Sequence, residues 1–160
     1  MSADQQIVTF LWCDGFAEEQ MNHYVSIFKN SKVIGITRWG DTGPGPKGSV
    51  LTVTYELNGQ RFMAVNGGPM FKYSEAVSLL INCDTQDEID YFWSRLTEGG
   101  TESRCGWLKD KFGLSWQVAP RALGKFLNDK DPQKANRAMA AMMQMSKMDL
   151  GKLQAAFDGR

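Results

Sequence analysis

The sequence predicts an α+β protein made of two similar strand–helix–strand–strand–strand modules, followed by C-terminal helices. Short runs rich in β-branched and aromatic residues predict strands, and two longer segments carry apolar residues at i, i+3, i+4 and i+7. The pattern also repeats: Trp12-Cys13-Asp14 closes one apolar run, and Asn82-Cys83-Asp84 closes another 70 residues later.

The first module is predicted over residues 5–67. Its strand, helix and three further strands are expected at residues 7–12, 17–30, 32–38, 49–57 and 60–65. Asp14-Gly15 is the turn before the helix, and Asn58-Gly59 predicts a tight hairpin between the last two strands. Residues 40–48 must form a loop, because their glycines and prolines cannot sustain a strand ladder.

The second module is predicted over residues 74–120, and the two modules together form one domain over residues 1–120. Its elements are expected as a strand, a helix, a very short strand and two further strands, at residues 76–82, 85–98, 100–105, 105–110 and 114–119. Asp84 or Thr85 begins the helix, with Glu88 placed for a capping box.

Residues 121–160 are predicted to be a helical extension. Asp131-Pro132 is a typical helix start, and a second helix begins at Asp149. Five of the nine methionines lie between Met139 and Met148. This stripe fits either core packing or an adaptable interface between subunits.

The composition excludes several kinds of site. Eighteen basic residues balance eighteen acidic ones, so the chain has no surplus of positive charge for nucleic acid or an anionic membrane. His23 is the only histidine, which excludes any metal site that needs two or three imidazoles from one chain. The three cysteines are far apart and odd in number, and we expect reduced thiols.

No secretory signal or membrane span is recognisable, so we expect a cytoplasmic protein. We expect neither nucleic acid nor a membrane as a partner.

Three isolated side chains have chemical potential. His23 is either a general base or a half-exposed residue of the first helix. Cys13 is either a structural thiol or a nucleophile near a helix start. Asp110, between two lysines, is either a general acid or the centre of a solvated turn that it holds through an Asx-type hydrogen bond. We favour the half-exposed helix residue for His23, the structural thiol for Cys13 and the solvated turn for Asp110.

Four segments closely resemble the PhnB-like branch of the vicinal oxygen chelate superfamily, which includes glyoxalases, dioxygenases and bleomycin and fosfomycin resistance proteins. They are FLWCDGFAEEQMNHY at 10–24, GPGPKGSVLTV at 43–53, AVNGGP at 64–69 and CGWLKDKFGLSWQVAP at 105–120. The resemblance implies that the paired modules form a curved mixed sheet with a cleft. This branch often carries the description 3-demethylubiquinone-9 3-methyltransferase, but no cofactor-binding glycine motif follows the first strand.

The resemblance also implies where metal ligands would lie. Metal-dependent relatives use His, Glu or Gln on four strands, and the corresponding positions here hold Thr9, Ala64, Ala76 or Ser78, and Gln117. One suitable ligand in four cannot hold a divalent ion, so we expect a metal-free cleft and no cofactor.

Strand alternation places a set of small and polar residues on the expected concave face. The set is Thr9, Leu11, Phe62, Ala64, Asn66, Ser78, Ser115 and Gln117, with Ala76 beside Ser78. We expect these residues to bind a small molecule, and we expect a homodimer. The alternative is a metal-independent enzyme in which Gln117, Asn66 or Ser78 orients a small polar or aromatic substrate. The sequence does not decide whether the chain is an enzyme.

Overall fold

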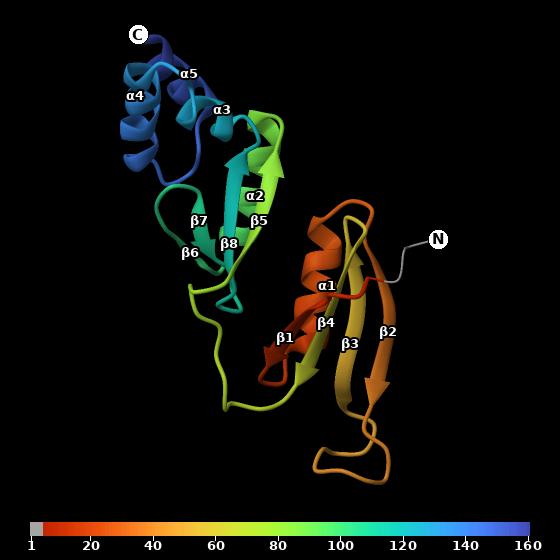
Figure 1. Cartoon of the computed structure of the whole chain (residues 1–160). Coiled ribbons are helices and arrows are strands. Elements are labelled where there is room, and N and C mark those ends of the chain that lie inside the picture. The colour runs from red at the N-terminus through yellow and green to blue at the C-terminus, as the bar shows by residue number, and fades with distance from the viewer. Residues whose placement is uncertain (1–4) are drawn as a thin grey trace. The chain divides into compact units, whose positions relative to one another are not determined.

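The computed structural model describes residues 5–160 (Figure 1). The chain divides into two compact units, Met1–Lys72 and Tyr73–Arg160. Each unit contains one four-stranded mixed sheet, and both sheets have the same strand order. The α+β prediction and the internal repeat are therefore confirmed.

Unit 1 consists of one helix and one sheet. Its elements are β1 (Thr9–Cys13), α1 (Ala17–Ile27), β2 (Lys32–Arg38), β3 (Val50–Leu57) and β4 (Gln60–Asn66). The strand order is β1-β4-β3-β2; β1 is parallel to β4, and the other neighbours are antiparallel. Asn58 and Gly59 both have positive φ angles, 48° and 81°, as a type I′ hairpin requires.

Helix α1 covers one face of this sheet and forms the core with it. Tyr24, Val53 and Tyr55 are fully buried there. A polar chain runs through this layer: the Cys13 thiol donates to the Gln20 side-chain oxygen at 3.2 Å, and Gln20 Nε2 lies 3.0 Å from the Tyr24 hydroxyl. Cys13 thus behaves as a structural thiol.

The loop between β2 and β3 packs on an indole ring. A Cβ atom added at Gly43 would lie 2.2 Å from the Trp39 ring, and one added at Gly45 would lie 2.1 Å from it. Only glycine allows the backbone to approach the ring this closely, which explains part of the glycine content of residues 40–48.

Unit 2 repeats the arrangement with shorter strands. Its elements are β5 (Ser78–Cys83), α2 (Gln86–Thr97), β6 (Thr101–Glu102), β7 (Trp107–Lys109) and β8 (Ser115–Pro120), in the order β5-β8-β7-β6. Thr85 is the N-cap of α2: its hydroxyl accepts from Glu88 N at 3.2 Å, and the Glu88 carboxylate accepts from Asp84 N at 2.7 Å. The predicted cap by Thr85 is confirmed, and Glu88 reaches back as in a capping box, but to the N–H of Asp84 rather than to that of Thr85.

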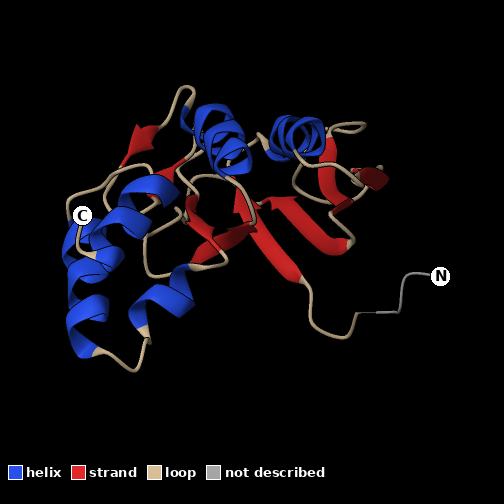
Figure 2. Ribbon diagram, turned by 90° about the horizontal axis from the view of Figure 1, so that it is seen from above, coloured by secondary structure: helices blue, strands red, loops and turns tan. Residues whose placement is uncertain are grey.

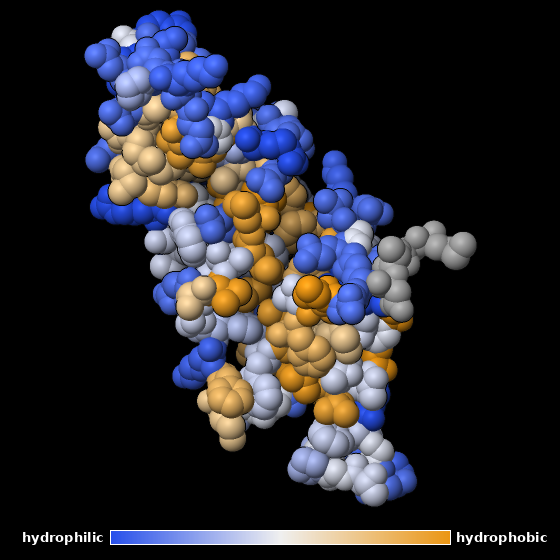
Figure 3. Space-filling model, in the orientation of Figure 1, coloured by the Kyte–Doolittle hydropathy of each residue, from blue (hydrophilic) through white to orange (hydrophobic). Residues whose placement is uncertain are grey.

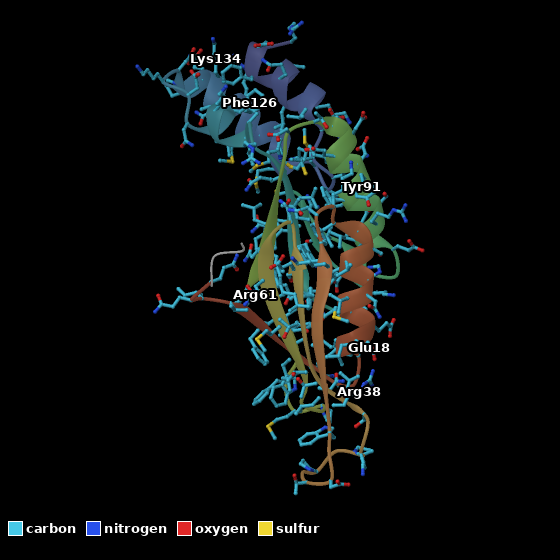
Figure 4. All side chains as sticks on the ribbon, turned by 90° about the vertical axis from the view of Figure 1, so that its right-hand side faces the viewer. Glu18, Arg38, Arg61, Tyr91, Phe126 and Lys134 are labelled. Carbon is cyan, nitrogen blue, oxygen red and sulfur yellow. The ribbon has the colours of Figure 1, made fainter. Side chains whose placement is uncertain are left out.

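The helical extension belongs to unit 2 and contains α3 (Leu123–Leu127), α4 (Pro132–Met143) and α5 (Leu150–Asp158). Figure 2 shows these helices gathered near the C-terminus. The structure adds α3, which the sequence pattern did not predict. Phe126 of α3 contacts Phe157 of α5 edge-on at 5.4 Å, and Lys134 of α4 lies over the Phe157 ring; Phe126 and Lys134 are labelled in Figure 4.

One glutamine fastens the extension to α2. Gln86 Nε2 donates to the Met148 carbonyl at 3.1 Å, and Gln86 Oε1 accepts from Leu150 N at 2.8 Å. Nearby, Lys147 forms an ion pair with Asp90 of α2 at 2.6 Å. The start of α5 is therefore held by side chains from the first turns of α2.

The methionine stripe divides between core and surface. Met148 is fully buried, whereas Met139 and Met143 are 42% and 50% exposed. Figure 3 shows pale orange, apolar atoms over α4. Core packing accounts for Met148 but not for the methionines of α4.

Candidate functional site

In unit 1 the predicted binding residues share one face of the sheet, and α1 covers that face. The register pairs Thr9 with Phe62 and Leu11 with Ala64. Phe62 stacks on the buried Tyr55 ring at 5.6 Å, and Leu11 and Ala64 are buried. Leu11, Phe62 and Ala64 are thus part of the hydrophobic core between the sheet and α1, whereas Thr9 is half-buried.

The Asn66 side chain hydrogen-bonds to backbone groups of α1 and β3. Its side-chain oxygen accepts from Ala17 N at 2.9 Å, and its amide nitrogen donates to the Val50 carbonyl at 3.1 Å. Asn66 therefore supports the start of α1, a role that the sequence pattern did not indicate.

The opposite, open face of the first sheet carries different side chains. Arg61 lies directly opposite Glu56, and Lys32 reaches Glu56 at 3.3 Å. Figure 4 shows Arg61 on the side of the sheet away from α1, while the labelled Glu18 and Arg38 lie near α1 and form an ion pair at 3.8 Å. Phe10 of β1 alternates onto this open face and is 54% exposed.

In unit 2 the structure brings three predicted residues together. Ser78 pairs with Ser115 across the parallel strands, and Gln117 Nε2 donates to the Ser78 hydroxyl at 2.9 Å. Their neighbours in sequence, such as the buried Trp116 and Val118, point to the opposite face, where α2 packs. Ser78, Ser115 and Gln117 thus lie on the face that α2 leaves open.

Ser115 is the unusual member of this group. The residue is 1% exposed, and its hydroxyl has no hydrogen-bond partner among the residues that the structure describes. A buried hydroxyl without a partner costs about 1–3 kcal/mol, so a hydrogen bond from a molecule that reached it would recover that free energy.

The surroundings of these three residues are part apolar and part ionic. Trp107 lies opposite Gln117, and Lys109 lies opposite Ser115. Lys109 pairs with Glu75; this hydrogen bond and the positive charge lower the pKa of the Glu75 carboxyl. Leu80 of β5 is 53% exposed and alternates onto the same face. Ala76 lies in the turn before β5, outside the strand expected at 76–82. This arrangement can hold a small ligand between neutral hydrogen-bonding groups and an apolar wall.

Asp110 requires a correction, because the expected turn is not solvated. Its side chain is buried; Oδ1 accepts from Phe112 N at 2.9 Å and Leu114 N at 3.1 Å, and Oδ2 accepts from Trp116 Nε1 at 2.8 Å. The Asx-type bond is confirmed. The sequence concealed the burial because two lysines flank the residue and only the fold places Trp116 beside it.

The remaining titratable candidates lie on separate elements of the fold. His23 is a half-buried residue of α1, with its ring 5.9 Å from that of Tyr24. The three cysteines are free thiols, as expected; burial, with help from the Glu88 and Asp84 charges, raises the pKa of Cys83 to about 11.

A sequence profile of the family described as 3-demethylubiquinone-9 3-methyltransferase matches residues 5–119. The chain belongs to this family. This is the PhnB-like branch of the vicinal oxygen chelate superfamily, as the four sequence segments indicated. No curated protein matches the chain significantly.

Solved structures agree with the assignment to the PhnB-like family. The PhnB protein of Bacillus cereus is 38% identical, and the match covers 72% of this chain and 99% of that chain with a TM-score of 0.67. A Pseudomonas aeruginosa protein is 21% identical over 73% and 98% of the chains, with a TM-score of 0.61. The fosfomycin resistance protein FosX of Listeria monocytogenes, 10% identical over 76% and 94%, has a TM-score of 0.53. The last two show the fold alone.

The FosX structure contains Mn(II). We therefore tested whether the residues of this PhnB-like chain could hold a divalent metal ion. Within residues 5–160, no three His, Cys, Asp or Glu side chains gather where they could hold a metal ion. Ser78 and Gln117 offer only a neutral hydroxyl and amide, which are poor ligands for such an ion. The residues present do not fit the metal site of a metal-dependent relative. Among the helices of the described chain, none has the length and apolar character needed to cross a membrane.

Proposed function

We propose that this PhnB-like protein binds a small molecule on the open face of the second sheet, without a metal ion or cofactor. The observation that carries the proposal is the buried hydroxyl of Ser115, which has no hydrogen-bond partner in the described structure and lies beside the Gln117–Ser78 pair. The bond between Gln117 and Ser78 leaves the Gln117 side-chain oxygen as an acceptor for the ligand.

The chemistry of the ligand follows from these groups. Ser115 offers a hydroxyl donor and Gln117 an amide acceptor, while Leu80 and Trp107 supply apolar contact. A neutral compound with both a hydrogen-bond donor and an acceptor on a planar or apolar body matches this set. The Lys109–Glu75 ion pair is exposed to solvent, so it can rearrange to admit such a compound at small energetic cost.

The first test is native mass spectrometry of freshly purified protein, which reports any retained ligand, metal and subunit number together. A library of small polar aromatic compounds is then screened by thermal shift. We expect hits to stabilise the wild-type protein and to lose this effect in Gln117→Ala. Gln133→Ala, at an exposed position of α4, is the matched control.

Equal thermal shifts in Gln117→Ala and the control would place binding elsewhere and contradict the proposal. About one Zn, Ni, Mn or Fe per chain bound at this face would contradict its metal-free character. Turnover that disappears in Gln117→Ala while binding persists would instead support the metal-independent enzyme.

We also propose that the chain forms a homodimer. Phe10 is an exposed apolar side chain on β1, at the edge of the first described sheet. Edge strands with exposed apolar residues are usually covered by another chain or element. Light scattering at micromolar concentration tests this, and a monomer would contradict it.

A further inference from the structure

The Ser115 hydroxyl is buried on the face of the second sheet opposite α2. Ser115 is the first residue of β8, which lies between β5 and β7. The residue is 1% exposed, and its hydroxyl has no hydrogen-bond partner within the described part of the chain. Because α2 packs on the other face, different groups shield this hydroxyl from water.

The register of the sheet identifies the neighbours of Ser115 on its own face. Ser78 of β5 is its partner on one side, and Lys109 of β7 is its partner on the other. Directly paired residues direct their side chains to the same face of a sheet. Ser78, Ser115 and Lys109 therefore form one row across the three strands, with the unpartnered hydroxyl at its centre.

An ion pair spans this row. Glu75 lies in the turn before β5, three residues before Ser78, and its carboxylate is bound to the Lys109 ammonium group. The bond joins a group on the β5 side of β8 to a group on the β7 side. The two side chains must therefore extend across β8 close to its first residue, Ser115.

The exposure of the ion pair makes it easy to separate. The Lys109 side chain is 44% exposed and the Glu75 side chain 60% exposed. Ion pairs of this kind contribute little to stability, and salt screens the attraction between their charges. The pair is therefore in equilibrium with a separated state in which both charges are solvated.

We propose that the Glu75–Lys109 ion pair is a gate over the Ser115 hydroxyl, closed when the pair is formed and open when it separates. The inference rests on the proposed function, because it adds control of access to the same binding face. Opening the gate exposes a donor that has no partner in the closed state. Ionic strength then controls access of a neutral ligand to this face, although the ligand itself carries no charge.

The test measures how fast N-ethylmaleimide, a small neutral reagent, reaches position 115 in Ser115→Cys. The full-length protein also carries Cys105→Ser, because Cys105 is a partly exposed free thiol. Cys13 and Cys83 are buried, and the Cys105→Ser protein without the change at position 115 gives their background rate. Circular dichroism checks that each variant is folded.

Breaking the pair from either side should accelerate the modification. Glu75→Gln and Lys109→Met each remove one charge while keeping a side chain of similar length, and each should raise the rate about two- to fivefold. Raising the salt concentration from about 0.01 M to about 1 M should also raise the rate while the pair is present. The salt effect should disappear in Glu75→Gln.

The two variants together separate a gate from a simple effect of charge on the thiol. A change in the thiol pKa alone would move the rates in opposite directions, since Glu75→Gln leaves an unpaired cation nearby and Lys109→Met an unpaired anion. Opposite changes, or no change in either variant, would overturn the gate. Asp41→Asn, which breaks the exposed pair with Lys47 in unit 1, is the matched control and should leave the rate unchanged.

A second measurement needs no substitution at position 115. Compounds found by thermal shift should bind Glu75→Gln about two- to fivefold more tightly than the wild type. Compounds that depend on Gln117 but bind both proteins equally would overturn the gate and leave the proposed function standing. Faster labelling in both variants, without any compound that depends on Gln117, would support the gate and contradict the proposed function.

Discussion

The two units have the same strand order, yet they complete their sheets differently. In unit 1, β2 and β3 contain seven and eight residues, and in unit 2 their counterparts β6 and β7 contain two and three. The backbone N–H groups of Cys105 and Gly106, beside β7, are instead paired with carbonyls that follow α4. Where the second sheet is short, the helical extension satisfies the backbone, which indicates that the extension is part of the unit rather than an appendage.

The helices of the two units also begin differently. Helix α2 begins with local side-chain hydrogen bonds from Thr85 and Glu88, whereas the N-cap of α1 is Phe16, which provides no side-chain hydrogen bond. The Ala17 N–H is instead satisfied by Asn66, 49 residues away. One start is therefore encoded locally, and the other depends on the folded sheet.

The largest effect is expected from Asp110 in unit 2. Asp110→Ala removes the acceptor of three N–H groups, including the indole of Trp116, and should lower the free energy of unfolding by about 3 kcal/mol. Urea unfolding measures the loss, and hydrogen exchange should locate it in unit 2. Asp41→Ala, at an exposed residue of unit 1, should change stability by less than about 1 kcal/mol. Equal losses for the two variants would show that Asp110 has no special structural role.

The second largest loss of stability is expected where the 40–48 loop packs on the Trp39 indole. Gly43→Ala places a Cβ against Trp39 at a φ angle of 115° and should cost about 2 kcal/mol. Gly40→Ala is the matched control, since a Cβ there has no heavy atom within 4 Å. Urea unfolding followed by circular dichroism measures both variants. A neutral Gly43→Ala would show that the loop moves away from the ring without cost.

Substitutions at the two helix starts should differ in how far through the structure hydrogen exchange increases. Thr85→Ala should cost about 1 kcal/mol and increase hydrogen exchange only in the first turn of α2. Asn66→Ala should cost a similar amount, but with faster exchange both at the start of α1 and beside Val50. Asn136→Ala, at an exposed position of α4, should cost nothing. Increased exchange at α1 alone in Asn66→Ala would contradict the long-range support.

The last effect is a dependence on alkaline pH, which is absent at neutral pH and is therefore the smallest under ordinary conditions. Because burial raises the pKa of Cys83 to about 11, the thiol stays protonated in the folded chain at pH values where the unfolded chain, with a pKa of about 8.5, releases the proton. The stabilisation is complete below about pH 8.5 and is lost as the pH rises toward 11. Urea midpoints should fall over this range, and less steeply in Cys83→Ala than in the wild type. At pH 8, iodoacetamide should modify Cys105 well before Cys83; the reverse order would contradict the burial of Cys83.

Much of the fold could be predicted because its signals are local. The Asn58-Gly59 turn, the Thr85 cap and the Asp131-Pro132 helix start each depend on a few adjacent residues, and the structure contains all three. Helix α3 was missed because its five residues include Gly124 and are too few to show a helical period. The burial of Asp110 depends on Trp116, a contact that no local pattern reveals.

The candidate site was only partly predictable, because alternation identifies which residues share a face but not which face the helix covers. Both faces of β1 are apolar, so its alternation does not show whether Thr9 and Leu11 face the helix or the open side. The hairpin contained a usable signal: its register pairs Ala64 with Val53 and Phe62 with Tyr55, and the alternation of β3 marks that side as apolar. In unit 2 the same reasoning from alternation placed Ser78, Ser115 and Gln117 together on the face that α2 leaves open. Their part in ligand binding stays a prediction.

The contacts of Gln86 have a consequence for exchanging parts between relatives. A single side chain in α2 accepts from Leu150 and donates to Met148, and residues 105–106 bond to the segment after α4. A chimaera that takes the helical extension from this chain and the remainder from another PhnB-like protein must therefore carry a glutamine at this position and a matching 105–106 turn. The extension and its recipient surface have to be inherited as a pair.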